Sequence, residues 1–243
     1  MSSGGFSMRQ ILAATVAMLA IVTAAGAADS VATEAGSATY NWSGFYAGVL
    51  LGYGTGDSSA ISDNGFDGSA PEDRADLSPK GFAGGAVAGY NWQRDQLVFG
   101  VESEVGYLGA KDDFWFPDGD DYFARSEYGL YGSLAGRLGF AIDRTLITAR
   151  AGVIVADIDY GYGDIDGGVN GEPDPDSSIF GDGARAGFTI GASIEHAFAG
   201  DWVGRLDYAY SDFGSHIETD GFDETYDVSD NLHMIRIGLI KKF

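Results

Sequence analysis

Residues 231–243 read Asn-Leu-His-Met-Ile-Arg-Ile-Gly-Leu-Ile-Lys-Lys-Phe, and this stretch is the most informative feature of the chain. Apolar side chains occupy alternate positions from 235 to 239, and the intervening positions hold Arg236 and Gly238. Because successive side chains of a strand point to opposite faces, the stretch predicts a strand with one apolar and one mixed face. A terminal Phe243 is common by chance, so its meaning depends on the rest of the chain.

The other end of the chain predicts export. A basic start at Arg9 precedes an apolar run over residues 11–23, and Ala25-Gly26-Ala27 is an A-x-A cleavage pattern. The run is shorter than the about 20 residues of a membrane-spanning helix, which favours a secretory signal peptide over residues 1–27 rather than an anchor. Cleavage after Ala27 and cleavage after Ala28 both fit. Residues 28–41 are small and polar, and we expect them to form a short, loose periplasmic lead-in.

The composition of the 243-residue chain favours strands in one domain after the signal. It has 38 Gly, 13 Tyr and 15 Phe against 5 Pro, and no further apolar run approaches the length of a membrane helix. The absence of cysteine excludes a disulfide framework, thiol catalysis and cysteine-based zinc sites.

Period-two alternation predicts eight strands, at residues 42–55, 80–92, 96–110, 125–142, 145–158, 183–198, 202–213 and 231–243. Tight turns at 93–95, 143–144 and 199–201 fall at one end of this array. Long polar segments at 56–79, 111–124, 159–182 and 214–230 all fall at the other end. Outer-membrane barrels have this asymmetry, with short periplasmic turns and long extracellular loops. The sequence therefore predicts an all-β fold, an eight-stranded antiparallel up-and-down transmembrane β-barrel over residues 42–243.

The two faces of the strands separate a membrane barrel from a soluble barrel or sandwich. A soluble barrel turns its bulky apolar face inward and its polar face to water. Here the polar face is rich in Gly, Ala and Ser and suits a narrow interior better than a solvated surface. Carboxylates and guanidiniums on that face can pair in the lumen. The predicted lumen charge network comprises Glu102, Glu104, Arg137, Arg150, Arg185, Glu195, Arg205, Asp207 and Arg236.

Aromatic residues on the apolar face gather near both ends of the predicted strands, as expected for two interfacial girdles. Near the short turns are Phe45, Trp92, Phe99, Phe140, Phe198, Trp202 and Phe243. Near the long segments are Tyr53, Tyr107, Tyr128, Tyr208 and Tyr210. Because lipid cannot satisfy a free strand edge, the first and last strands must pair.

Several strands resemble a known family. The segments that show the resemblance are residues 41–48 with 51–54, 81–85 with 89–92, 99–102, 206–214, and 235–239 with Phe243. Together they resemble small alphaproteobacterial outer-membrane barrels, the OmpA-like and porin-like surface antigens. The resemblance implies outer-membrane localisation in a Gram-negative bacterium, a terminal strand and Phe243 read by the assembly machinery, and no enzyme activity. Lys241 departs from the family, which usually has an apolar residue there; a lysine near an interface can snorkel.

The formal net charge of −22 resides largely in the four long segments. A solvated, self-repelling surface is the simpler interpretation. Divalent cation binding is the alternative, since Asp118-Gly119-Asp120-Asp121 and Asp164-Ile165-Asp166-Gly167 offer oxygen ligands without the full EF-hand spacing. An acidic rim would repel nucleic acid. The expected partners are outer-membrane lipid, lipopolysaccharide and the assembly machinery, and no cofactor is expected.

Catalysis is not expected. Ser211, Asp212 and His216 are close in sequence, but Ser211 and Asp212 point to opposite faces of their strand. Three functions remain: a structural surface protein of the envelope, a porin for small solutes, and an adhesion or ligand-binding protein acting through its loops. An eight-stranded barrel is just wide enough to be filled by side chains, which disfavours a wide channel.

Overall fold

The computed structural model describes residues 40–62, 73–115, 122–164, 178–181, 183–219 and 225–243. The predicted signal peptide and all of the lead-in except Tyr40 and Asn41 lie outside these residues. Within the described ranges, no helix has the length and apolar character to cross a membrane.

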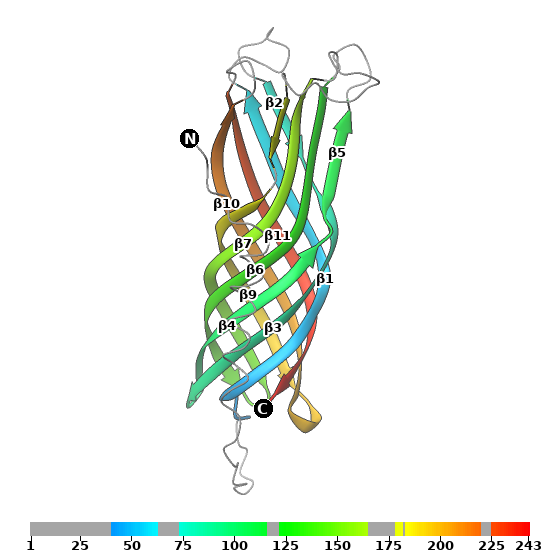
Figure 1. Ribbon diagram of the computed structural model, residues 1–243. Coiled ribbons are helices and arrows are strands. Elements are labelled where there is room, and N and C mark those ends of the chain that lie inside the picture. The colour runs from blue at the N-terminus through cyan, green and yellow to red at the C-terminus, as the bar shows by residue number, and fades with distance from the viewer. Residues whose placement is uncertain (1–39, 63–72, 116–121, 165–177, 182, 220–224) are drawn as a thin grey trace, which may run out of the picture.

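A closed ring of eight long antiparallel strands forms the molecule (Figure 1). They are β1 (Gly44–Ser62), β3 (Lys80–Arg94), β4 (Leu97–Leu108), β6 (Tyr122–Ile142), β7 (Thr145–Asp164), β9 (Ala184–Ala197), β10 (Trp202–Thr219) and β11 (Thr225–Lys242). The last strand closes on the first, from Tyr46 opposite Lys242 to Ser62 opposite Tyr226. The Phe243 N–H extends this ladder by donating to the Phe45 carbonyl at 2.8 Å. The predicted eight-stranded barrel is confirmed.

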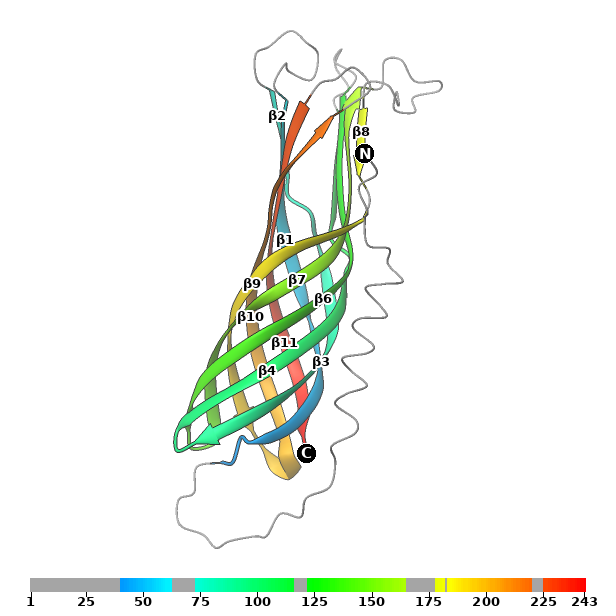
Figure 2. The same ribbon diagram turned by 60° about the vertical axis from the view of Figure 1, so that its left-hand side comes forward.

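The short turns lie together at the end of the barrel that also holds the C-terminus (Figures 1 and 2). We call this the short-turn end, and the opposite end the long-segment end. Asp95 and Asp143 open two-residue turns with positive φ angles of 55° and 50°, which aspartate tolerates better than most residues. A single 3-10 turn at Ala199–Asp201 joins β9 to β10.

The long polar segments contain more strand than their composition predicts. β1, β7 and β10 continue well into them, and three short strands are added: β2 (Asp73–Leu77), β5 (Lys111–Trp115) and β8 (Ser178–Gly181). The prediction of loops throughout these segments was therefore wrong. Strands that meet water on their outer face need no apolar alternation, so period-two patterning missed them. Polar pairs support them instead, such as the Ser59 and Ser229 hydroxyls 2.8 Å apart.

Beyond the closed ring, the wall divides into two sheets (Figure 2). One has the order β2-β1-β11-β10, and the other has the order β5-β6-β7-β8. The β9–β10 ladder ends where Asp212 faces Phe188. Among the described residues, no ladder joins the far end of β10 to β8, or β2 to β5.

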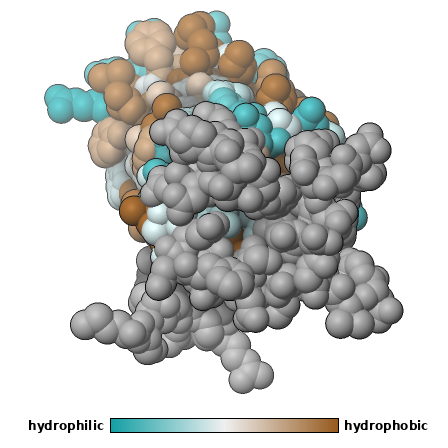
Figure 3. All heavy atoms as spheres, turned by 90° about the horizontal axis from the view of Figure 1, so that it is seen from above, coloured by the Kyte–Doolittle hydropathy of each residue, from teal (hydrophilic) through white to brown (hydrophobic). Residues whose placement is uncertain are grey.

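Apolar side chains cover the outside of the ring, which Figure 3 shows end-on in brown where grey atoms do not hide them. The belt includes Leu138 and Val153, each 60% exposed, and Ile237, 67% exposed. Nine of the predicted girdle aromatics are exposed at the ends of this belt: Tyr53, Trp92, Phe99, Tyr107, Phe140, Phe198, Trp202, Tyr208 and Phe243. Phe45 and Tyr210 are half-buried against Tyr90 and His233.

Tyr128 contradicts the girdle prediction, because its side chain is buried inside the barrel. The β6–β7 register shifts between Tyr128 and Tyr131, so two residues of β6 face one residue of β7. Such a bulge exchanges the inward and outward positions along a strand. Tyr128 therefore points inward, and so does Tyr131 after the bulge, although an unbroken strand would place them on opposite faces.

Candidate functional site

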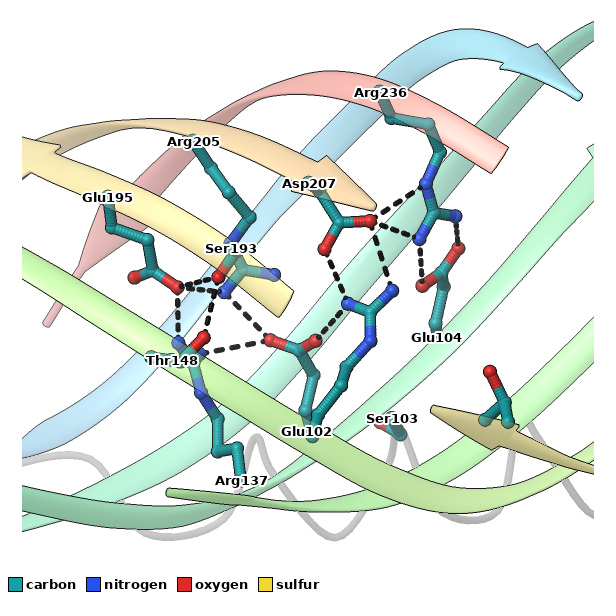
Figure 4. Close-up of polar contacts among 12 residues, drawn as sticks. Glu102, Ser103, Glu104, Arg137, Thr148, Ser193, Glu195, Arg205, Asp207 and Arg236 are labelled. Atoms are coloured by element: carbon teal, nitrogen blue, oxygen red, sulfur yellow. Dashed lines mark hydrogen bonds and ion pairs between the residues drawn. The ribbon is translucent and has the colours of Figure 1, made fainter. Parts of the chain in front are cut away.

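The middle of the barrel interior holds an ion-pair network, which we call the ionic belt (Figure 4). Glu102 lies at its centre. One carboxylate oxygen accepts from Arg205 at 2.8 Å and Arg137 at 3.1 Å, and the other accepts from Arg150 at 3.2 Å. Glu195 pairs with both Arg137 and Arg205 on the short-turn side of this centre. These charges come from β4, β6, β7, β9 and β10, so the network links strands across the lumen.

Asp207 extends the ionic belt toward the long-segment end. Its carboxylate lies 2.7 Å from Arg150 Nη1 and 2.6 Å from Arg236 Nη2. Arg236 in turn pairs with both oxygens of Glu104. Four arginines and four carboxylates thus alternate in one neutral, buried network. Buried charges are tolerable only when paired in this way, because desolvating an isolated ion costs several kcal/mol.

Two tyrosines complete the ionic belt. The Tyr46 hydroxyl donates to Glu102 at 2.8 Å, and the Tyr131 hydroxyl donates to Glu104 at 2.6 Å. A Cβ atom at Gly89 would collide with the Tyr46 ring, and one at Gly106 would collide with the Tyr131 ring. The glycines therefore make room for rings that lie against the wall and reach the belt. No role was assigned to either tyrosine from the sequence, although Tyr131 has the same inward parity as Arg137 on the unbroken part of β6.

The structure brings together eight of the nine predicted lumen charges, and Arg185 is the exception. Arg185 has inward orientation but lies nearer the long-segment end, where it donates to the Tyr160 hydroxyl at 2.7 Å and lies 3.6 Å from Glu218. The sequence predicted that Arg185 points inward, but it did not predict the position of Arg185 along the barrel axis, which depends on strand tilt and register. His216 Nε2 lies 3.7 Å from the same carboxylate. Burial, assisted by the charge of Arg185, lowers the pKa of His216 to about 4.

An apolar cluster closes the short-turn end of the interior. Trp42 is only 2% exposed there, and Tyr40 packs against the same cluster. Backbone hydrogen bonds hold this segment, since Trp42 N–H donates to the Gln93 side chain at 2.6 Å and Tyr40 N–H to the Asp143 carbonyl at 2.9 Å. We call Tyr40 and Trp42 the plug. The expected looseness of the lead-in is wrong for its last two residues, and Trp42 precedes β1 rather than opening it.

Apolar and polar layers also alternate beyond the ionic belt. A cluster around Ile154, Ile158 and Leu232 comes next, followed by a polar layer in which the Ser58 hydroxyl donates to Asp230 at 2.5 Å. Burial raises the pKa of the Asp230 carboxyl, which has no ion pair within reach in the described part of the chain. A last apolar cluster around Tyr162 and Tyr226 follows. Side chains therefore occupy the lumen at successive levels.

The candidate catalytic and metal-binding residues can be placed only in part. Ser211 is buried and its hydroxyl donates to Thr189 at 3.1 Å, whereas Asp212 accepts from the Gly214 N–H at 2.8 Å. In the described residues, no cluster of three or more His, Asp or Glu has metal-site geometry. The two predicted acidic motifs, except Asp164, lie outside the described residues.

Comparison with known families and proteins agrees with this architecture. The family described as "Outer membrane protein beta-barrel domain" matches residues 14–243. The 22 kDa outer membrane protein of Rhizobium leguminosarum bv. viciae is 32% identical over 118 residues, covering 49% of this chain and 46% of that protein. The 25 kDa outer-membrane immunogenic protein of Brucella canis is 27% identical over 154 residues, covering 60% of this chain and 64% of that protein. The chain thus spans less than two thirds of either relative.

Among solved structures, the outer membrane protein OprG from Pseudomonas aeruginosa aligns with a TM-score of 0.51 at 13% identity. The alignment covers 83% of this chain and 97% of that protein. At this identity the likeness concerns the fold alone.

Proposed function

The chain belongs to the outer membrane protein beta-barrel domain family, and we propose that it is a non-conducting, non-enzymatic structural protein of the outer membrane that presents an acidic surface to the exterior. By the asymmetry of such barrels, the short-turn end is periplasmic and the long-segment end is extracellular. The apolar belt around the ring is the lipid-facing surface.

The filled lumen is the observation that carries the proposal. The ionic belt joins charges from opposite walls, and the plug occupies the periplasmic end. Passage of a solute would require displacing several buried ion pairs, and leaving even one buried charge without its partner costs about 3–5 kcal/mol. The interior is therefore suited to stiffening the barrel rather than to transport.

Planar-bilayer recording of the refolded protein tests this proposal. We expect no stable conductance steps, and retarded gel migration after heating should show that the inserted protein was folded. Reproducible conductance steps would overturn the structural proposal and support the porin alternative.

A variant with Tyr40 and Trp42 both replaced by glycine provides a control for the plug. It removes the plug but leaves the rest of the apolar cluster and the ionic belt, so we expect it to remain silent as well. Conductance that appears only in this variant would assign the closure to the plug rather than to the belt.

The exterior supports the surface-presenting part of the proposal. Asp57, Asp113, Asp159 and Asp227 are all exposed on the extracellular strands. An acidic surface favours cationic over anionic partners. Variants with these residues changed to asparagine should lose binding of a cationic probe peptide. Unchanged binding would contradict the proposed role of the acidic surface.

A further inference from the structure

Two lysines face each other at the extracellular edge of the apolar belt. Lys80 begins β3 and Lys111 begins β5, their Cα atoms are direct partners in the ladder, and both side chains are exposed. Like charges directly opposite on neighbouring strands destabilise a sheet. In the described part of the chain, neither ammonium group has a hydrogen bond or an ion pair. Among the described residues, no ion pair of either lysine offsets this repulsion, because Glu127, the other ladder partner of Lys111, is paired with Arg125.

Lys241 and Lys242, at the periplasmic edge of the apolar belt, do have oxygen partners. Lys241 Nζ donates to the Gly200 carbonyl at 2.5 Å and lies 3.8 Å from Asp201. Lys242 Nζ donates to the Asn41 carbonyl at 2.5 Å. Oxygen atoms thus hold the lysines at the short-turn edge of the belt, whereas no described residue forms a hydrogen bond or ion pair with the two lysines at the other edge.

The position of the pair matches the level of lipid headgroups. Phe82, 82% exposed, is the next outward-facing residue after Lys80 on β3, and it packs edge-on against Tyr53 with ring centroids 5.7 Å apart. Two residues of strand advance about 6–7 Å, so Lys80 and Lys111 lie just beyond the aromatic limit of the belt. Their ammonium groups can reach the layer where phosphates of the outer leaflet lie.

Arg125 on neighbouring β6 adds a third outward cation. Its guanidinium is 61% exposed and pairs with Glu127 at 2.9 Å. Two carboxylates belong to the same surface: Glu127 is the ladder partner of Lys111, and exposed Asp113 is the ladder partner of Arg125. With Glu127 held by Arg125, the two lysines remain available to an external anion.

We propose that Lys80 and Lys111, flanked by Arg125, bind a phosphate group of an outer-leaflet glycolipid. A phosphate between two ammonium groups replaces their repulsion with charge-assisted hydrogen bonds. The acyl chains of the same lipid lie along Phe82 and Tyr53 below. This site is independent of whether the barrel conducts, so a failure of the proposed function would leave it standing.

Lipid binding to the full, refolded chain in zwitterionic detergent tests the proposal. The probes are diphosphorylated lipid A, the same lipid without phosphates, and inorganic phosphate. We expect Lys80→Gln/Lys111→Gln to weaken binding of diphosphorylated lipid A by about tenfold or more, and Lys241→Gln to leave it unchanged. The wild type should bind the dephosphorylated lipid about tenfold more weakly. Equal binding by the double variant, or equal binding of the two lipids, would overturn the site.

Two further results make the test specific. Inorganic phosphate that binds as tightly as lipid A would overturn the assignment to a lipid. Without any phosphate, the double variant should unfold at the same or a higher temperature than the wild type, because repulsion is relieved. With lipid A present the order should reverse, and a variant that is less stable under both conditions would assign the lysines a structural role.

Discussion

The membrane band, which is the part of the ring covered by the apolar belt, and the extension at the long-segment end are built from the same strands but satisfy their strand edges differently. In the band every strand has two partners, and the ring closes from β1 through β11. In the extension the same wall divides into two sheets, whose orders are β2-β1-β11-β10 and β5-β6-β7-β8. Lipid offers no hydrogen bonds to a free strand edge, whereas water does. The solvent around the wall therefore determines whether the ring must close.

The interiors of the membrane band and of the extension also differ, in how deeply their charges are buried and how closely they are paired. The ionic belt buries eight charges with mutual partners inside the band. The extension contains looser pairs, such as Arg185 with Glu218 at 3.6 Å, where the carboxylate side chain is 40% exposed. Pairs near water contribute little, and breaking a buried pair is expensive. The two regions should thus respond very differently to equivalent substitutions.

The largest contrast is expected between two arginines. Arg236→Met should lower the free energy of unfolding by about 3–5 kcal/mol, because Glu104 and Asp207 lose a buried partner. Arg125→Met removes the exposed pair with Glu127 and should cost less than about 1 kcal/mol. Urea unfolding in detergent or lipid vesicles measures both values. Similar losses for the two variants would break the comparison.

Removal of the plug tryptophan should have the next largest effect. Trp42→Ala empties a buried position at the periplasmic end, and large-to-small changes of buried aromatics cost about 3–5 kcal/mol. We expect the lower part of that range or less, because the plug lies outside the ladder. Ile217→Ala, at a residue 73% exposed in the extension, is the matched control and should change stability by less than about 0.5 kcal/mol.

A smaller effect is expected where glycine makes room for a tyrosine. Gly89→Ala places a Cβ against both the Tyr46 ring and the Val101 carbonyl, which forces the ring away from Glu102 at a cost of about 1–3 kcal/mol typical of overpacking. Tyr46→Phe at an unchanged Gly89 separates the lost hydrogen bond from the steric effect. Unfolding curves of both variants, measured side by side, test this order. A Gly89→Ala protein as stable as the wild type would show that Tyr46 has another position available.

The smallest effect concerns pH and belongs to the extension. Because the pKa of His216 is about 4 in the folded protein, the unfolded chain binds its proton first as pH falls. The stability from neutral His216 is therefore complete above about pH 6.5 and is lost as pH falls toward 4. Allowing for solvent screening, the loss should be about 1–2 kcal/mol. His216→Gln should reduce the acid sensitivity by that amount, and an identical pH profile would contradict it.

The sequence alone predicted the features that depend on neighbouring residues. Alternation from 235 to 239 identified a two-faced strand. The same alternation along the other strands placed Glu102, Asp207 and Arg236 on the inward side, where their ion-pair partners also lie. The spacing of turns and polar segments also predicted eight strands in antiparallel order. Side-chain direction in a strand repeats every two residues, so these properties are local.

Other features were beyond local pattern. Polar strand ends such as residues 56–62 of β1 lack apolar alternation, so their pairing was not predicted. Trp42 was assigned to a strand because nothing in its neighbourhood reveals that it turns under the barrel. Arg185 and the eight belt charges share inward parity, and only strand tilt and register separate them.

Sequence patterns alone thus predicted the eight strands of the closed ring, the face of most side chains and the outer-membrane localisation. Three features required the folded structure: which charges meet, the bulge that turns Tyr128 inward, and the pairing of Lys80 with Lys111, for which no described residue supplies an ion pair. Side-chain parity and turn chemistry are set within a few residues, whereas ring closure and cross-lumen contacts join residues more than a hundred positions apart, such as Glu104 and Arg236 at a separation of 132.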